Sequence, residues 1–366
     1  MDTTTTTGTT SPATTESTVE QFADTVFADL LGAQNVSALY LGDRLGWYRT
    51  LATEGPMTAD ELAHRTGTVP RYAREWLEHQ SVAGYLTAQV RHDPVRFELP
   101  QAHAEVLVNQ DSLSYMASLS RFFAATGAAL PSLVQAYRNG GGVSWQQLGT
   151  DAREAQAYAN RPMFLGQLTQ DFLPQIPDLH QRLQSGGQVA DIGCGEGWSA
   201  IALALGYPEI AVDGFDVDAA SIAAATRNAA AHGVGDRVHF RIADLRDAEL
   251  TGRYDAVFAF ECVHDLSDPV AFLSTARRIA APGAPVVIMD ERTAESFAAD
   301  AGPVEQLLYG FSILCCLPDG MSDPDSAATG TVMRHSTLES YARSAGFDGA
   351  TIVDIDHDMF RFYRLQ

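Results

Sequence analysis

The chain has 366 residues, 46% of them hydrophobic and 19% charged, which is enough for about two or three domains with sizeable cores. Its 46 acidic residues face 24 basic residues, all of them arginine, and the formal net charge is −22. This balance argues against a general nucleic-acid binder, whose affinity comes from neutralising phosphates, and no segment suggests a membrane span.

The N-terminal third predicts a tail followed by a winged helix. Residues 1–18 are rich in threonine with little to bury, so we expect a disordered tail there. Two helical patterns follow between Val19 and Ala52. The next elements are a capped helix over Met57–Ala63, a turn at Gly67, a helix through Arg71 to Leu77, and two strands at Tyr85–Thr87 and Arg96–Leu99. Helix, turn, helix and hairpin are typical of a winged helix, which we place over residues 19–110.

A winged helix often reads DNA, so a ligand-sensing transcription regulator is one interpretation of the chain. The second helix offers Arg71 and Arg74, but Glu75 and Glu78 on the same helix cancel their charge. Together with the acidic composition, this pattern disfavours the regulator.

Residues 111–183 are rich in helix formers, with interruptions at Pro131, at Gly140–Gly142 and at Pro162. We expect connecting helices here that form a lid over a substrate cavity.

The stretch from Val189 to Gly197 joins a buried strand to a glycine turn and is the most informative part of the chain. Gly193, Gly195 and Gly197 remove side chains where a ligand would lie against the backbone. Asp191 would repel a pyrophosphate at a helix N-terminus, and it suits a cationic or ammonium-bearing ligand better. The flanking elements are a strand over Gln188–Ile192 and a helix over Trp198–Leu205.

Two further predicted strands end in acids. Ile210–Phe215 is followed by Asp216, which can accept both hydroxyls of a ribose. Val238–Ile242 is followed by Asp244 and Leu245, close to where an adenine amino group would lie. The alternative is a doubly wound domain for a different nucleotide, but an NAD-type site prefers G-x-G-x-x-G, which this turn lacks at its third position.

Three acids that close three successive strands resemble the class I S-adenosylmethionine-dependent methyltransferases. From Val19 onward the chain is similar to plant and bacterial small-molecule O-methyltransferases, whose winged helix serves as a dimerisation domain. The resemblance implies an α/β fold with a Rossmann-like sheet over 184–366, S-adenosylmethionine as cofactor and S-adenosylhomocysteine as product. The residues it assigns to the cofactor are Asp191, Gly193 and Gly195 for the methionine half, Asp216 for the ribose, and Asp244 and Leu245 for the adenine, with Phe260 beside them.

The remaining pattern completes the sheet. Its last two strands predict an antiparallel closing pair, which fits the methyltransferase variant of the doubly wound fold. The elements are strands at Tyr254–Phe260, Pro285–Asp290, Thr351–Ile355 and Phe360–Leu365, helices at Pro269–Ala280, Leu307–Cys316 and Leu338–Ala345, a turn at Leu317–Met321 and a loop at Asp323–Gly330.

His264 is the candidate general base. It follows the fourth strand, whose carboxyl end faces the cofactor's methyl group in this fold. The resembling O-methyltransferases carry a His-Asp pair here, matched by Asp265, whereas the tryptophan common after that pair is Leu266 in this chain. Asp290 or Glu291, at the end of the fifth strand, can fix the histidine tautomer, and we choose Asp290. The alternative is that His264 only hydrogen-bonds a loop.

Four apolar or aromatic residues are candidate substrate contacts, each with core packing as the alternative: Tyr158, Met163, Tyr309 and Met321. An iron site of two histidines and one carboxylate that includes His335, as in some ketoacid C-methyltransferases, lacks a short ligand motif, so we assign no metal. The four cysteines lack metal-type spacing and are typical of a reducing compartment.

The sequence therefore predicts a cytoplasmic, homodimeric methyltransferase that modifies an oxygen of a small acceptor in secondary metabolism. A C-methyltransferase is an alternative. So is a pericyclase or decarboxylase that uses the sulfonium only as a fixed charge. No nucleic-acid or membrane partner is expected.

Overall fold

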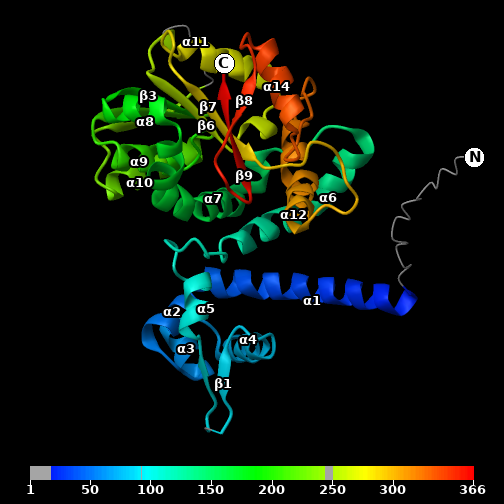
Figure 1. Cartoon of the computed structure of the whole chain (residues 1–366). Helices are drawn as coiled ribbons and strands as arrows, with labels where there is room; N and C mark the ends of the chain where they lie inside the picture. Colours follow the sequence, from blue (N-terminus) through cyan, green and yellow to red (C-terminus); the bar gives the residue numbers. More distant parts are fainter. Residues whose placement is uncertain (1–17, 92, 244–249) are drawn as a thin grey trace, which may run out of the picture.

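The computed structural model describes residues 18–91, 93–243 and 250–366. Figure 1 shows a small helical unit that carries the long helix α1 (Val19–Arg44), and a larger unit built around a β-sheet. The tail expected over 1–18 lies outside the described residues except for Thr18, whose side chain caps α1. In the described ranges no helix combines the length and the apolarity needed to cross a bilayer.

The small unit is the winged helix that the sequence predicts. Thr58 caps α3, and the Glu61 carboxylate accepts the Thr58 backbone N–H at 2.8 Å, which completes the expected capping box. Trp47, Tyr48 and Trp76 form the aromatic centre of its core. The elements are α2 (Trp47–Glu54), α3 (Ala59–Thr66), α4 (Pro70–Val82), β1 (Thr87–Gln89), β2 (Arg96–Glu98) and α5 (Gln101–Leu107).

The first strand of the wing begins later than predicted. The backbone N–H groups of Tyr85 and Leu86 both donate to the Gln80 carbonyl, at 2.9 and 3.2 Å, so these residues close the C-terminus of α4. Strand pairing starts at Thr87, opposite Glu98. Hydrogen bonding to the free carbonyl at the helix end therefore outweighs the strand propensity of Tyr85.

The connecting helices match two of the three predicted interruptions. Pro131 lies inside α6, so the interruption predicted there is wrong. Gly140–Gly142 separates α6 from α7, and the α-helix α7 ends one residue after Pro162, where a π-helix begins. An interior proline costs a backbone hydrogen bond, and burial of Phe122 and Leu133 in a shared core offsets it. The elements are α6 (Leu119–Asn139), α7 (Trp145–Met163), the π-helix η1 (Phe164–Phe172), the short η2 (Leu173–Gln175) and α8 (Pro177–Gln184).

The larger unit contains a seven-stranded sheet in the order β5-β4-β3-β6-β7-β9-β8. Neighbouring strands are parallel except where β9 meets β7 and β8, which confirms the antiparallel closing pair. The strand order reverses between β3 and β6, and ligands of such sheets bind beyond the carboxyl ends at this point. The strands are β3 (Gly187–Ile192), β4 (Ile210–Asp216), β5 (Val238–Ile242), β6 (Ala256–Phe260), β7 (Val286–Glu291), β8 (Ala350–Val353) and β9 (Phe360–Leu365).

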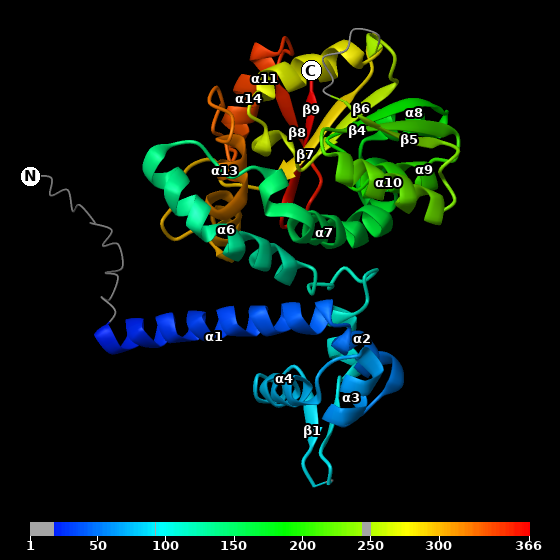
Figure 2. The same cartoon turned by 180° about the vertical axis from the view of Figure 1, so that it is seen from behind.

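Helices cover both faces of this sheet and bury one hydrophobic core on each face (Figure 2). The turn predicted at Leu317–Met321 is instead the short helix α13, because Pro318 falls in its first turn, where a missing N–H costs nothing. The helix predicted at Leu307–Cys316 divides into α12 and a π-helical turn. The elements are α9 (Trp198–Gly206), α10 (Ala219–Ala231), η4 (Val263–Asp265), α11 (Pro269–Ile279), α12 (Pro303–Phe311), η5 (Ser312–Cys316), α13 (Leu317–Gly320) and α14 (His335–Ser344).

Candidate active site

The glycine turn, residues 193–197, lies at the carboxyl end of β3, beside the end of β6. Gly193 and Gly195 have φ angles of 79° and 50°, a region that side-chain-bearing residues rarely adopt. A Cβ atom on Gly193 would lie 2.7 Å from Sγ of Cys262, the second residue after β6. The turn therefore presents bare backbone at the switch point of the sheet.

Asp216 binds the backbone of this turn, and Asp191 binds the helix α9 that follows it. Asp191 is fully buried, and its Oδ2 accepts a hydrogen bond from Ser199 Oγ at 2.5 Å. The Asp216 carboxylate accepts the backbone N–H of Gly195 at 2.9 Å and that of Asp218 at 2.8 Å. The structure thus brings the two acids and the turn together, as the cofactor assignment requires.

Other residues assigned to the cofactor or the substrate have different surroundings. Phe260 is only 5% exposed, and its ring meets that of Phe164 at a centroid distance of 5.5 Å. Met163 lies in the same core. Asp244 and Leu245 lie outside the described residues. Phe260 and Met163 therefore pack in the core of the larger unit.

Two acids around the turn have a raised pKa. Burial raises the pKa of Asp191 to about 7. Burial, with the nearby Glu154 charge, raises the pKa of Glu196 to about 7. Asp191 Oδ1 has no hydrogen-bond partner within the described ranges. Bare buried carboxylates fit a ligand that brings its own positive charge, and S-adenosylmethionine brings an ammonium and a sulfonium.

Glu261 is a site residue that the sequence analysis missed. It directly follows β6, and its φ of 51° is unusual for a residue with a side chain. Its Oε2 accepts a hydrogen bond from Gln156 Nε2 of α7 at 3.1 Å, while its buried Oε1 is unpartnered in the described chain. An acid that ends an apolar strand at the crevice edge was the available signal, the same signal that identified Asp216.

His264 lies in η4, just beyond Glu261, and is only 3% exposed. Its Nδ1 is 2.7 Å from Asp290 Oδ1 and 2.9 Å from Glu291 Oε2. Its Nε2 is 3.3 Å from Asp265 Oδ1. The predicted partner Asp290 is therefore in place, and carboxylates face both ring nitrogens.

These carboxylates decide the charge of the ring. Burial alone would lower the pKa of His264, but the facing charges of Asp265, Glu291 and Asp290 outweigh burial and hold its pKa well above the usual range. Burial raises the pKa of Glu291 well above its usual range. The facing carboxylates therefore favour the protonated form of the His264 ring.

The remaining substrate candidates lie on three different elements. Tyr158 of α7 is half-buried between the guanidinium of Arg121, 5.6 Å from its ring centroid, and the ring of Trp198 at 6.4 Å. Tyr309 of α12 accepts a hydrogen bond from Arg334 Nη2 at 3.0 Å. Met321, just after α13, is 36% exposed. Tyr158 thus lies beside the helix that follows the glycine turn.

His335 does not join His264. Its Nε2 donates to the Ala350 carbonyl at 2.8 Å, and its ring stacks on Tyr363 at a centroid distance of 5.6 Å. Within the described ranges it belongs to neither compact cluster of acids or thiols around His264. The iron alternative is therefore wrong about this residue.

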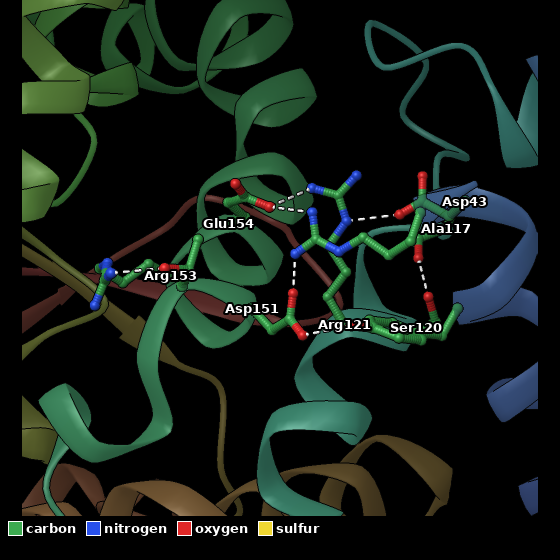
Figure 3. A network of polar contacts seen from close by, with 10 residues as sticks. Asp43, Ala117, Ser120, Arg121, Asp151, Arg153 and Glu154 are labelled. Atoms are coloured by element: carbon green, nitrogen blue, oxygen red, sulfur yellow. Dashed lines mark hydrogen bonds and ion pairs between the residues drawn. The ribbon is translucent and has the colours of Figure 1, made fainter. Parts of the chain in front are cut away.

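A largely buried ionic network joins α1 of the winged-helix unit to the connecting helices α6 and α7 (Figure 3). Arg121 of α6 has a side chain only 8% exposed and binds Asp43 of α1 at 2.6 Å and Glu154 of α7 at 2.9 Å. Arg44 of α1 pairs with the same glutamate and with Asp151. The network ties α1 to α7, the helix that also supplies the partner of Glu261.

Comparison with known proteins agrees with this architecture. Residues 183–313 match the model of a methyltransferase domain, and residues 35–109 match that of an Rv2258c-like winged HTH domain. The chain is 31% identical to norajmaline N-methyltransferase of Rauvolfia serpentina over 134 residues, 35% of this chain and 46% of that protein. The chain thus spans less than half the length of this curated relative.

Solved structures match over almost the whole chain. Mitomycin 7-O-methyltransferase MmcR superposes with a TM-score of 0.70 at 20% identity, covering 94% of this chain and 97% of that one. Human N-acetylserotonin methyltransferase, in complex with S-adenosylmethionine, gives 0.67 at 17% identity, covering 96% and 99%. At these identities the likeness shows the fold.

The fold and cofactor class expected from the sequence are confirmed at the level of the domain. The chain therefore carries a class I S-adenosylmethionine-dependent methyltransferase domain behind an N-terminal winged helix-turn-helix domain.

Proposed function

We propose that the chain transfers a methyl group from S-adenosylmethionine to a hydroxyl of a small-molecule acceptor, in natural-product metabolism, with His264 as general base. One observation carries this proposal: a buried histidine, oriented through Nδ1 by Asp290, stands after β6 at the edge shared with the glycine turn. In-line displacement needs alignment of two reactants and removal of one proton, and this arrangement can supply both.

The turn residues would hold the cofactor. Asp191, Gly193 and Gly195 would contact its methionine half and Asp216 its ribose, and the bound cofactor would supply the activated methyl carbon. Asp244 and Leu245 remain the adenine assignment. Helices over 111–183 would form the lid, with Tyr158 facing the acceptor.

His264 must lose its proton before it can act as a base. We infer that the acceptor hydroxyl displaces Asp265 from Nε2, which removes one of the charges that keep the ring protonated. Because the pKa of His264 is raised, activity should increase with pH as the ring becomes neutral. A pH–rate profile of kcat that is flat across this rise would contradict the base assignment.

The direct test is transfer of a labelled methyl group from S-adenosylmethionine to a phenolic or alcoholic acceptor. His264→Ala should lower turnover by about two to four orders of magnitude. His239→Ala removes an exposed histidine of β5 and is the matched control. Unchanged turnover in His264→Ala would remove that residue from the base role. Conversion of the acceptor without label in the product would favour a pericyclase or decarboxylase, and label on carbon would favour C-methylation.

A nitrogen acceptor is the second candidate. The excess of carboxylates around His264 favours a cationic group such as a protonated amine. An amine acceptor should then compete for the site better than its hydroxyl analogue, and its turnover should survive His264→Ala to a greater extent.

We further propose that two copies pair through the N-terminal domain. Helix α1 extends away from the rest of the chain (Figure 1) and exposes a row of apolar side chains: Val19, Phe22, Val26, Phe27, Leu30 and Leu31. Between α6 and α12 lies an open apolar hollow of about 350 Å³. A second copy would cover this surface. Light scattering of the wild type against Phe22→Glu tests it, with a dimer expected only for the wild type.

The four free cysteines suit a reducing cytoplasm.

The winged helix would serve dimer assembly rather than DNA binding. Arg71, which could otherwise contact a phosphate, pairs with Glu75 on the same helix surface. A salt-dependent shift of duplex DNA by the full chain would instead support a regulator.

A further inference from the structure

We propose that Glu261 forms an anionic wall against the cofactor's sulfonium and makes the site bind the charged methyl donor more tightly than the neutral-sulfur product. This inference rests on the proposed cofactor and adds a residue, and a basis for discrimination, to it.

The position of Glu261 lies between the two halves of the site. On one side, Cys262, its neighbour in the chain, contacts the glycine turn at Gly193. On the other side, His264 follows three residues later, in η4. We therefore infer that the methyl group, on its way from a cofactor on the turn to an acceptor at His264, passes Glu261.

A hydrogen bond holds the Glu261 carboxyl in place, but one of its oxygens has no partner among the described residues. Gln156 of α7 donates to Oε2 at 3.1 Å, and Asn160 of the same helix is a second hydrogen-bonding neighbour. Oε1 is buried and has no hydrogen-bond partner in the described residues. Asp191, fully buried on the same crevice, also has an unpartnered oxygen. Two bare oxygens from adjacent strand ends suit two cationic groups of one ligand.

The two ligands of the reaction differ at one of those groups. S-adenosylmethionine and S-adenosylhomocysteine share the ammonium, the ribose and the adenine, but only the former has a positively charged sulfur. A carboxylate that faces the sulfur therefore loses its attraction once the methyl group has left. The product is then released more readily than the donor, without any movement of the chain.

Calorimetry with three probes separates the possible contacts of Glu261. The probes are S-adenosylmethionine, S-adenosylhomocysteine and sinefungin, which carries an ammonium in place of the sulfonium. In Glu261→Gln we expect the Kd of the two charged probes to rise about tenfold or more, and that of S-adenosylhomocysteine to change less than about twofold. Glu78→Gln makes the same change on an exposed face of α4 and is the matched control.

Two outcomes would overturn the inference. Equal weakening of all three probes would place the carboxylate at the shared ammonium. No weakening of any probe would place it against the acceptor or α7 only. If the wild type itself fails to bind S-adenosylmethionine, the proposed function fails, which is a separate result.

Proton release gives a second readout that needs no variant. Burial raises the pKa of Glu261 to about 8, against opposing effects of Asn160, His264 and Gln156 and with the charge of Asp290 adding to the rise. Binding a cation favours the carboxylate, so the donor should release more protons than the product at pH 7. Protons released at Asp191 by the shared ammonium cancel in this difference. Calorimetry in buffers of different ionisation enthalpy measures the number of protons released. Equal proton release on binding the donor and on binding the product would contradict the inference.

Discussion

The domain junction and the predicted cofactor site both bury acids, but among the described residues only the acids of the junction pair with an arginine. At the junction, Arg121 meets Asp43 and Glu154 within 2.9 Å. In the crevice, Asp191 and Glu261 each keep a bare oxygen. The charge of a buried acid that pairs with an arginine is already compensated in the folded chain. A buried acid without such a partner indicates a ligand that brings the missing positive charge.

Breaking the junction should have the largest effect on stability. Arg121→Met leaves the buried Asp43 without its guanidinium, so the free energy of unfolding should fall by about 3 kcal/mol or more. Urea denaturation measures this change. Arg44→Met, whose side chain is 29% exposed, is the control and should cost about 1 kcal/mol. An equal loss of unfolding free energy in the two variants would mean that the greater burial of Arg121 does not make its ion pairs more important for stability.

Removing a crevice acid should weaken the ligand instead. Asp216→Ala should raise the Kd of both S-adenosylmethionine and S-adenosylhomocysteine about tenfold or more, because a hydrogen bond to a charged group contributes about 1.5–3 kcal/mol. Asp236→Ala, an exposed acid of the same domain, is the comparison. Full affinity in Asp216→Ala by calorimetry would defeat the ribose assignment.

The bare acids also predict how stability depends on pH. The pKa of Asp191 is about 7 in the folded chain against an ordinary 3.8, so the folded state holds a proton that the unfolded state has lost between these values. Stability of the ligand-free chain should therefore fall as pH rises from about 4 to 7, by at least about 1.4 kcal/mol. Asp191→Asn should flatten this slope in thermal melts. A slope unchanged in the variant would assign the effect to another group.

An exposed pair should have the smallest effect. Arg71 and Glu75 pair on the surface of α4 with side chains 69% and 66% exposed. Arg71→Ala should change the free energy of unfolding by less than about 0.5 kcal/mol. A larger loss, measured by the same denaturation, would show that exposure is a poor guide in this chain.

Local sequence was sufficient to place Asp191 and Asp216 at one edge of the sheet, but it was not sufficient for the junction. Asp191 and Asp216 end apolar runs, so parallel strands alone place them at one edge. The contact of Asp290 with His264 also follows from strand order, because β6 and β7 are neighbours. By contrast, Arg121 meets Asp43 across 78 residues, and no local period encodes that pairing.

Two errors have different physical causes. The helix through Pro131 is stabilised by tertiary packing, which a proline-based rule ignores, whereas the short helix at Leu317–Gly320 tolerates Pro318 because it lies in the first turn. Glu261 ends an apolar strand, but the sequence does not show that its backbone is left-handed. Its backbone angle is a property of the folded chain alone.

The left-handed backbone at Glu261 implies a trade-off between robustness and turnover. A φ of 51° costs a side-chain-bearing residue about 1 kcal/mol or more, a cost that glycine would avoid. Selection for heat tolerance alone would therefore drive this position toward glycine, and laboratory evolution that rewards only solubility should find the same change. A chain that keeps glutamate here has retained a less durable backbone in exchange for a negative charge.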